Sequence, residues 1–235
     1  QVPALQVVLS TLEAAPVDIR NSIIPAKIWM IFLTAFSDRE KGKKIFAELE
    51  ALCQKRYRKK LELVCLFERP HKHPLIVPKV IQVSVFLQVL IVIYECIKFC
   101  RDNKQTLVFV PRKRDGTWLK MILNLFVKTS LVHSSTENKD EILDCFRNKE
   151  LDVLVCTTLL ERGITIPSVQ VVVFKGNHSV FTTASLIQIF GRVGRSFKDP
   201  KGEGICLCQF SNQSIKDCVY QISKMNDTVY AATKK

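Results

Sequence analysis

Two arginines in the segment Gln188–Arg195 are the residues of this sequence whose types and spacing most directly indicate chemistry. Arg192 and Arg195 lie three positions apart, and Gly191 and Gly194 directly precede them. Because glycines carry no side chain, a ligand can approach both guanidinium groups closely. A guanidinium is planar and permanently charged, which suits phosphate oxygens. The segment therefore indicates phosphate binding, and the alternative interpretation is a basic helix start that faces solvent.

A second polar segment, residues 157–167, begins about thirty residues earlier. It follows an apolar run typical of a buried strand and opens with two adjacent hydroxyl residues, Thr157 and Thr158. Gly163 and Thr165 come next, in a Gly-hydrophobic-polar-hydrophobic-Pro pattern. This turn is the second candidate ligand-binding segment.

Alternating strands and helices are expected to position both segments. The predicted strands are residues 106–110, 129–133, 152–156, 169–174 and 204–210. The predicted helices are residues 117–126, 139–146 and 183–190. Such alternation predicts an α/β fold with a parallel sheet covered by helices on both faces. Because ligands bind at the carboxyl ends of such strands, Arg112, just after the first of them, joins the threonines as a candidate phosphate contact.

The first 79 residues are expected to form a separate region. Residues 28–33 form an apolar run that ends at Thr34 and Ala35. Prolines in residues 69–78 indicate an extended connector, and we place a domain boundary near residue 80. Residues 80–99 are strongly apolar but interrupted by polar side chains, which favours a buried helix over a membrane span.

Composition limits the choice of partners and metals. The formal charge of +13 favours an anionic partner such as nucleic acid. Nine scattered cysteines without a CxxC pair indicate free thiols in a reducing compartment, and we expect no zinc. The pair His71 and His73 lacks a third ligand in its spacing, so it is interpreted as structural. No secretory signal is recognised at the start of the sequence.

The pattern Q-x-x-G-R-x-G-R at residues 188–195 resembles the sixth motif of superfamily 2 helicases. Residues 157–167 resemble the fifth motif, and the run ending at Thr34 and Ala35 resembles the third. The resemblance implies a RecA-like three-layer domain, the helicase C-terminal domain, at residues 80–235. It also implies that residues 1–79 are the remnant of a first RecA-like domain.

The resemblance narrows to the C-terminal half of the ComFA family of late-competence ATPases, which are related to primosomal helicases. It rests on Phe109–Pro111, Glu161–Pro167, His178–Phe181, Gln188–Ser196 and Lys216–Asn226. ComFA-like proteins are thought to drive single-stranded DNA through the membrane channel in natural transformation. We therefore expect single-stranded DNA and the competence uptake machinery as partners. The expected location is cytoplasmic or peripheral at the inner face of the membrane, and a homo-oligomer is left open.

The same resemblance assigns roles by position. Arg192, Arg195 and Gln188 would act at the γ-phosphate of ATP. Gly163, Thr165 and Gly191 would border the nucleotide, and Thr157, Thr158 and Arg112 would hold DNA. Thr34, Ala35 and Arg162 would couple the two sites, although Phe36 replaces a hydroxyl residue of the third motif.

No G-x-x-x-x-G-K-[ST] segment and no acidic D-E-x-D cluster occurs in this sequence. Mg²⁺ and most of the ATP would therefore be held by a P-loop-bearing RecA-like domain that this sequence lacks. We expect either half of an ATP-driven DNA translocase or a nucleic-acid-binding remnant that does not hydrolyse ATP, with little hydrolysis by the chain alone. An RNA helicase is the third reading.

Overall fold

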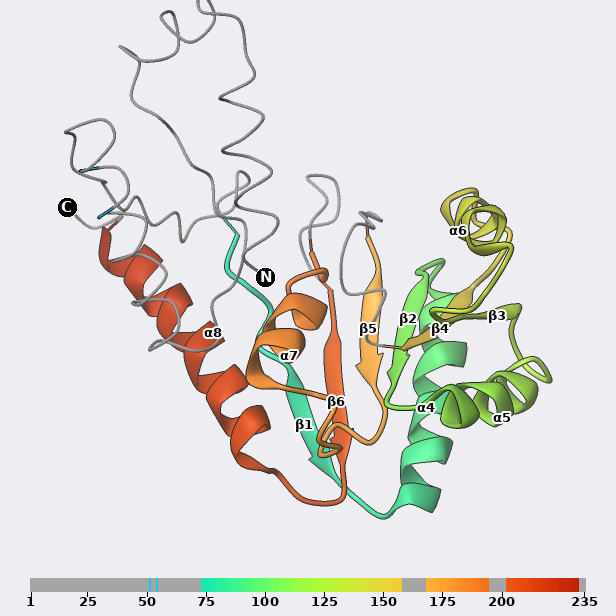
Figure 1. Cartoon of the computed structure of the whole chain (residues 1–235), viewed down its shortest axis with the longest axis horizontal. Coiled ribbons are helices and arrows are strands. Elements are labelled where there is room, and N and C mark those ends of the chain that lie inside the picture. The colour runs from blue at the N-terminus through green and yellow to red at the C-terminus, as the bar shows by residue number, and fades with distance from the viewer. Residues whose placement is uncertain (1–50, 52–53, 55–72, 158–167, 195–201, 233–235) are drawn as a thin grey trace, which may run out of the picture. The chain divides into compact units, whose positions relative to one another are not determined.

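A parallel sheet forms the centre of the computed structural model, which describes residues 51, 54, 73–157, 168–194 and 202–232 (Figure 1). Within this part of the chain the sheet has six strands in the order β1-β6-β5-β2-β4-β3, and every neighbouring pair is parallel. The strands are β1 Lys79–Gln82, β2 Thr106–Val110, β3 Thr129–Val132, β4 Val153–Thr157, β5 Gln170–Val173 and β6 Gly204–Cys208. The helices are α4 Val85–Arg101, α5 Lys113–Leu123, α6 Lys139–Arg147, α7 Thr183–Phe190 and α8 Gln213–Ala232.

The four central strands are buried along their whole length. Every residue of β2, β4, β5 and β6 is buried, and most of these residues are valine, isoleucine, leucine or cysteine. β-Branched and other apolar side chains fit a strand that is covered on both faces. The edge strands β1 and β3 keep partly exposed positions, as expected where one side of a strand has no neighbour.

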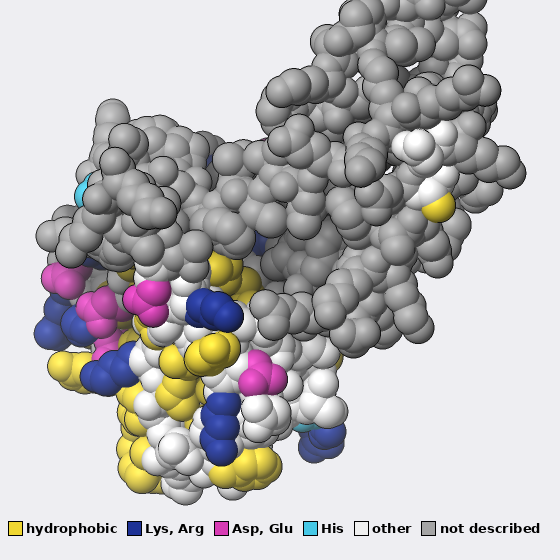
Figure 2. All heavy atoms as spheres, turned by 90° about the vertical axis from the view of Figure 1, so that its left-hand side faces the viewer, with side chains coloured by type: hydrophobic (Ala, Val, Ile, Leu, Met, Phe, Trp, Pro, Cys, Tyr) yellow, Lys and Arg dark blue, Asp and Glu magenta, His cyan; other side chains and the backbone are white. Residues whose placement is uncertain are grey.

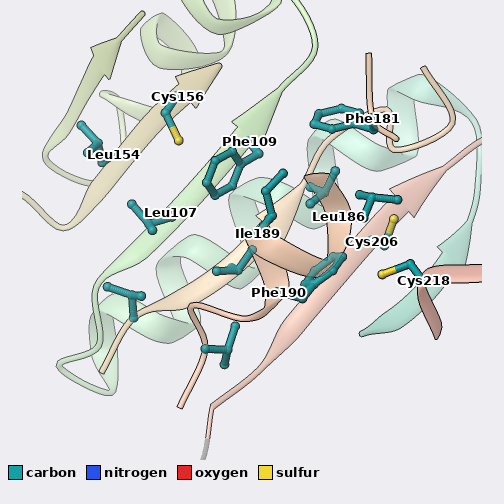
Figure 3. Close-up of a cluster of buried hydrophobic side chains, with 14 of the residues drawn as sticks. Leu107, Phe109, Leu154, Cys156, Phe181, Leu186, Ile189, Phe190, Cys206 and Cys218 are labelled. Carbon is teal, nitrogen blue, oxygen red and sulfur yellow. The ribbon is translucent and has the colours of Figure 1, made fainter. Parts of the chain in front are cut away.

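Helices cover both faces of the sheet, each over its own hydrophobic cluster. Alternate residues of β2 point to opposite faces, so Val108 joins one cluster and Phe109 the other. The cluster of Val108 includes side chains of α4 and α5, and the cluster of Phe109 includes side chains of α6, α7 and α8. Figure 3 shows Leu186, Ile189 and Phe190 of α7 in the second cluster, beside Phe109.

The predicted α/β class is confirmed, and the predicted strands agree with the structure within two residues. Three expectations were wrong in detail. The apolar residues 80–99 do not form one helix, because Lys79–Gln82 pairs with β6 as a strand and α4 begins at Val85. Helix α5 begins at Lys113 rather than residue 117. Helix α8 was not predicted at all.

Candidate functional site

The carboxyl ends of β2 and β4 bring two of the predicted DNA contacts together. Val110 and Thr157, the last residues of these strands, are register partners in the sheet. Arg112 follows Val110 by two positions and is exposed, as are Lys113 and Arg114 at the start of α5. This edge of the sheet therefore combines a threonine with three adjacent cations. The other predicted threonine of this turn, at position 158, lies outside the described residues.

The hydroxyl of Thr157 is buried without a hydrogen bond. Thr157 is 8% exposed, and its Oγ1 has no partner within the described part of the chain. A buried hydroxyl left unsatisfied costs about 1–3 kcal/mol. Such a group is tolerated where a ligand or an ordered water supplies the missing bond.

Helix α5 begins beside this hydroxyl without a side-chain cap. Arg112 occupies the N-cap position with an extended backbone, φ −132° and ψ 150°, and its side chain makes no capping bond. Within the described residues, no hydrogen bond satisfies the N–H groups of Lys113 and Arg114. Free N–H groups and the helix dipole make a helix N-terminus attractive to phosphate. The three exposed cations add to that attraction.

Gly116 holds the start of α5 close to the sheet. A Cβ built at Gly116 would lie 2.7 Å from Leu131 Cδ1 and 3.2 Å from Val110 Cγ2. The missing side chain therefore lets the first turn of α5 approach the ends of the strands. The sequence interpretation missed Lys113 and Arg114, although their place directly after Arg112 and a strand end was a usable signal.

The conserved-motif arginine that the structure describes, Arg192, lies at the opposite end of α7. Gly191 caps the helix, and its N–H donates to the carbonyl oxygen of Ile187 at 2.8 Å. A Cβ on Gly202 would lie 2.5 Å from Val193 Cγ1, so this loop packs beside the chain that enters β6. The backbone of the segment therefore lies near the amino ends of strands, not at the carboxyl ends where Thr157 and Arg112 are found.

The charge of Arg192 nevertheless reaches the face of the sheet below α7. Arg192 is 5% exposed. Burial raises the pKa of the Cys156 thiol strongly, and the nearby Arg192 guanidinium acts in the opposite direction. Because Cys156 directly precedes Thr157, the buried cation and the candidate DNA contact are both close to the end of β4. Gln188, on the same helix, is partly exposed.

Several predicted site residues lie outside the described part of the chain. They are Thr34, Ala35, Arg162, Gly163, Thr165 and Arg195.

The donors in the described part of the site suit phosphate oxygens rather than a metal ion. They are guanidinium groups, ammonium groups and backbone N–H groups. No group of three or more His, Cys, Asp or Glu side chains that could hold a metal is found among the described residues. The seven cysteines in this part of the chain are free thiols, and burial raises the pKa of Cys218 to about 12. Of the helices in the same part, none is long and apolar enough to cross a membrane.

Comparison with known proteins identifies relatives of the domain and of the chain. Residues 87–197 match the family described as helicase conserved C-terminal domain. Competence protein ComFA of Streptococcus pneumoniae is 37% identical over 207 residues, which cover 83% of this chain and 45% of that protein. ComFA of Bacillus subtilis is 37% identical over 100 residues, which cover 43% of this chain and 22% of that protein. The chain thus spans less than half the length of these relatives.

The fold is also similar to that of a solved helicase. Dbp5 of S. cerevisiae, in a structure with RNA and ADP BeF3, superposes with a TM-score of 0.51 at 19% identity. The match covers 76% of this chain and 46% of that chain. It shows that the described sheet and helices have the RecA-like arrangement of helicase C-terminal domains. The chain therefore contains a helicase conserved C-terminal domain, and its identity with ComFA is consistent with the C-terminal half of a ComFA protein.

Proposed function

We propose that this chain is the C-terminal motor half of a superfamily 2 ATP-dependent translocase that moves single-stranded DNA during uptake in natural transformation. The observation that carries the proposal is the carboxyl edge of the sheet. There, the buried and unsatisfied hydroxyl of Thr157 lies at the end of β4, beside the strand that leads into the uncapped start of α5. Three exposed cations surround that helix start.

The DNA would be held by its backbone at this edge. Thr157 would donate a hydrogen bond to a phosphate oxygen, and Thr158 would act next to it. Arg112 would form a charged contact, and Lys113 and Arg114 extend the set. Contacts of this kind position nucleic acid without reading its sequence, which suits a motor that must move along any strand.

Arg192 and Arg195 would stabilise the charge that develops on the γ-phosphoryl group of ATP, with Gln188 beside the same phosphate. Gly163, Thr165 and Gly191 would border the nucleotide. Bound ATP supplies the phosphoryl group whose transfer to water drives movement, and its Mg²⁺ would be held by a P-loop-bearing RecA-like domain. Thr34, Ala35 and Arg162 would relay between nucleotide and DNA.

The relatives support a wider setting for this activity. We propose that residues 1–79 belong to the first motor domain and its connector, and residues 80–235 to the second. The partners would be single-stranded DNA, the P-loop-bearing domain and the competence uptake machinery, at the inner face of the membrane. A homo-oligomer fits the same proposal.

A nucleic-acid-binding remnant that does not hydrolyse ATP is the second candidate. It is favoured by the sequence itself, which has the DNA-contact residues but no P-loop segment. Under this reading the arginines at 192 and 195 would persist without their chemistry.

Reconstituted ATP hydrolysis separates the two candidates. Hydrolysis stimulated by single-stranded DNA would be measured for this chain alone, for a P-loop domain of a ComFA protein alone, and for the mixture. We expect activity in the mixture, and a loss on the order of 10³-fold for Arg192→Ala or Arg195→Ala. DNA binding without hydrolysis in any mixture would favour the remnant.

A further inference from the structure

An ion pair joins the first turn of α5 to the residue after β5. Lys175 Nζ lies 2.7 Å from Asp115 Oδ1, and the two side chains are 29% and 11% exposed. Sixty positions separate the two residues in the sequence. Neither residue contributes to the roles proposed above, although Asp115 belongs to the helix turn that would receive the DNA phosphate.

The backbone at Lys175 is fixed from two sides. Its φ of 52° lies in the left-handed region, which a residue with a side chain adopts at a cost. Its N–H donates to Oε1 of the fully buried Gln88 at 3.1 Å, and Gln88 Nε2 donates to the carbonyl oxygen of Val83 at 3.0 Å. The next N–H, of Gly176, donates to the carbonyl oxygen of Leu207 at 2.7 Å. Lys175 is therefore a rigidly placed cation.

Asp115 sits where a carboxylate would normally close the helix start. It is the third residue of α5, and a side chain at that position commonly reaches back to the N–H of the N-cap residue. A carboxylate there would also repel a phosphate. In the structure Asp115 is bonded to Lys175 instead, and within the described residues it makes no capping bond.

We propose that Lys175 is a positioning residue for the phosphate of single-stranded DNA. It holds the Asp115 carboxylate away from the free N–H groups of α5 and cancels the negative charge that would otherwise repel the ligand. The inference rests on the proposed binding of DNA at this edge of the sheet. It adds a residue that acts through Asp115 and does not itself contact the strand.

The test is a set of variants of the whole chain: Lys175→Met, Asp115→Ala and the double variant. Lys216→Met is the matched control, because Lys216 is an exposed lysine of α8 on the other face of the sheet. Binding of a fluorescein-labelled oligothymidylate is measured by anisotropy at several salt concentrations. Thermal unfolding is measured in parallel, so that binding is compared among folded proteins.

Lys175→Met should weaken binding about five- to tenfold, because it leaves an unpaired carboxylate beside the phosphate. Asp115→Ala should bind at least as well as the wild type, and the double variant should recover most of the affinity lost in Lys175→Met. Lys216→Met should change little.

Two further results would count against the ideas separately. If the pair only supports the fold, both single variants and the double variant will lose thermal stability while their folded fractions bind like the wild type. That result would overturn the role of Lys175 alone. If the wild type and Lys216→Met do not bind the oligonucleotide in a salt-dependent manner, the proposed DNA site itself fails.

Discussion

At the scale of single residues, Thr157 trades stability for binding. Its hydroxyl is buried and has no partner within the described part of the chain. Thr157→Val keeps the shape and removes the unsatisfied group, so the free energy of unfolding should stay the same or rise by about 1 kcal/mol. The affinity for single-stranded DNA should fall about three- to tenfold, since the donor to phosphate is gone.

Thr157→Ser is the matched control for this prediction. It keeps the hydroxyl and removes one methyl group, so we expect binding close to that of the wild type. Chemical denaturation and oligonucleotide anisotropy measure the two effects. A valine variant that binds as tightly as the wild type would show that the hydroxyl does not contact DNA.

Single residues also show how far the site could be predicted from sequence. Thr157 and Arg112 were found because each follows an apolar run, and the ends of parallel strands meet at one edge. The pair of Asp115 and Lys175 could not be found this way, because their contact spans sixty positions and depends on the left-handed backbone of Lys175. The place of Arg192 was also missed, because a helix returns the chain to the other end of the sheet.

At the scale of elements, periodicity predicted the buried strands well and the edges poorly. β2 was predicted with its observed bounds because every residue of it is buried and apolar or β-branched. β1 is an edge strand of four residues, and its apolar letters run straight into α4, so no change of period marked the boundary. α8 alternates polar and apolar residues after the last strand, and it packs against α7 and the sheet through Ile215, Cys218 and Ile222.

The approach of α7 to β6 depends on a missing side chain at Gly204. A Cβ there would lie 2.9 Å from Cδ1 of Phe190, which is 1% exposed. We expect Gly204→Ala to lower the free energy of unfolding by about 1–3 kcal/mol, because the ring has little room to move. Denaturant unfolding measures the change.

Phe190→Leu provides the background that isolates this contact. With a smaller side chain at position 190, Gly204→Ala should cost clearly less than in the wild type, which is a coupling between neighbours. An equal cost in both backgrounds would mean that the alanine is disfavoured for another reason, such as strain in β6.

At the scale of the whole molecule, net charge alone does not define a binding surface. The chain carries a formal charge of +13. Figure 2 nevertheless shows a face on which Lys and Arg side chains are mixed with Asp, Glu and hydrophobic ones. If DNA bound through the overall charge, every exposed cation would contribute alike. If it binds at the carboxyl edge of the sheet, Arg112 should matter far more than a cation elsewhere.

The salt dependence of binding decides between these two cases. Arg112→Ala and Lys216→Ala each remove one positive charge, so both variants have the same net charge. For single strands the logarithm of the binding constant falls with the logarithm of salt concentration by about 0.7 for each phosphate neutralised. We therefore expect Arg112→Ala to make the slope shallower by about 0.7 and Lys216→Ala to leave it unchanged. Equal slopes for the two variants would mean that DNA is held by diffuse attraction, and that the start of α5 is not its binding site.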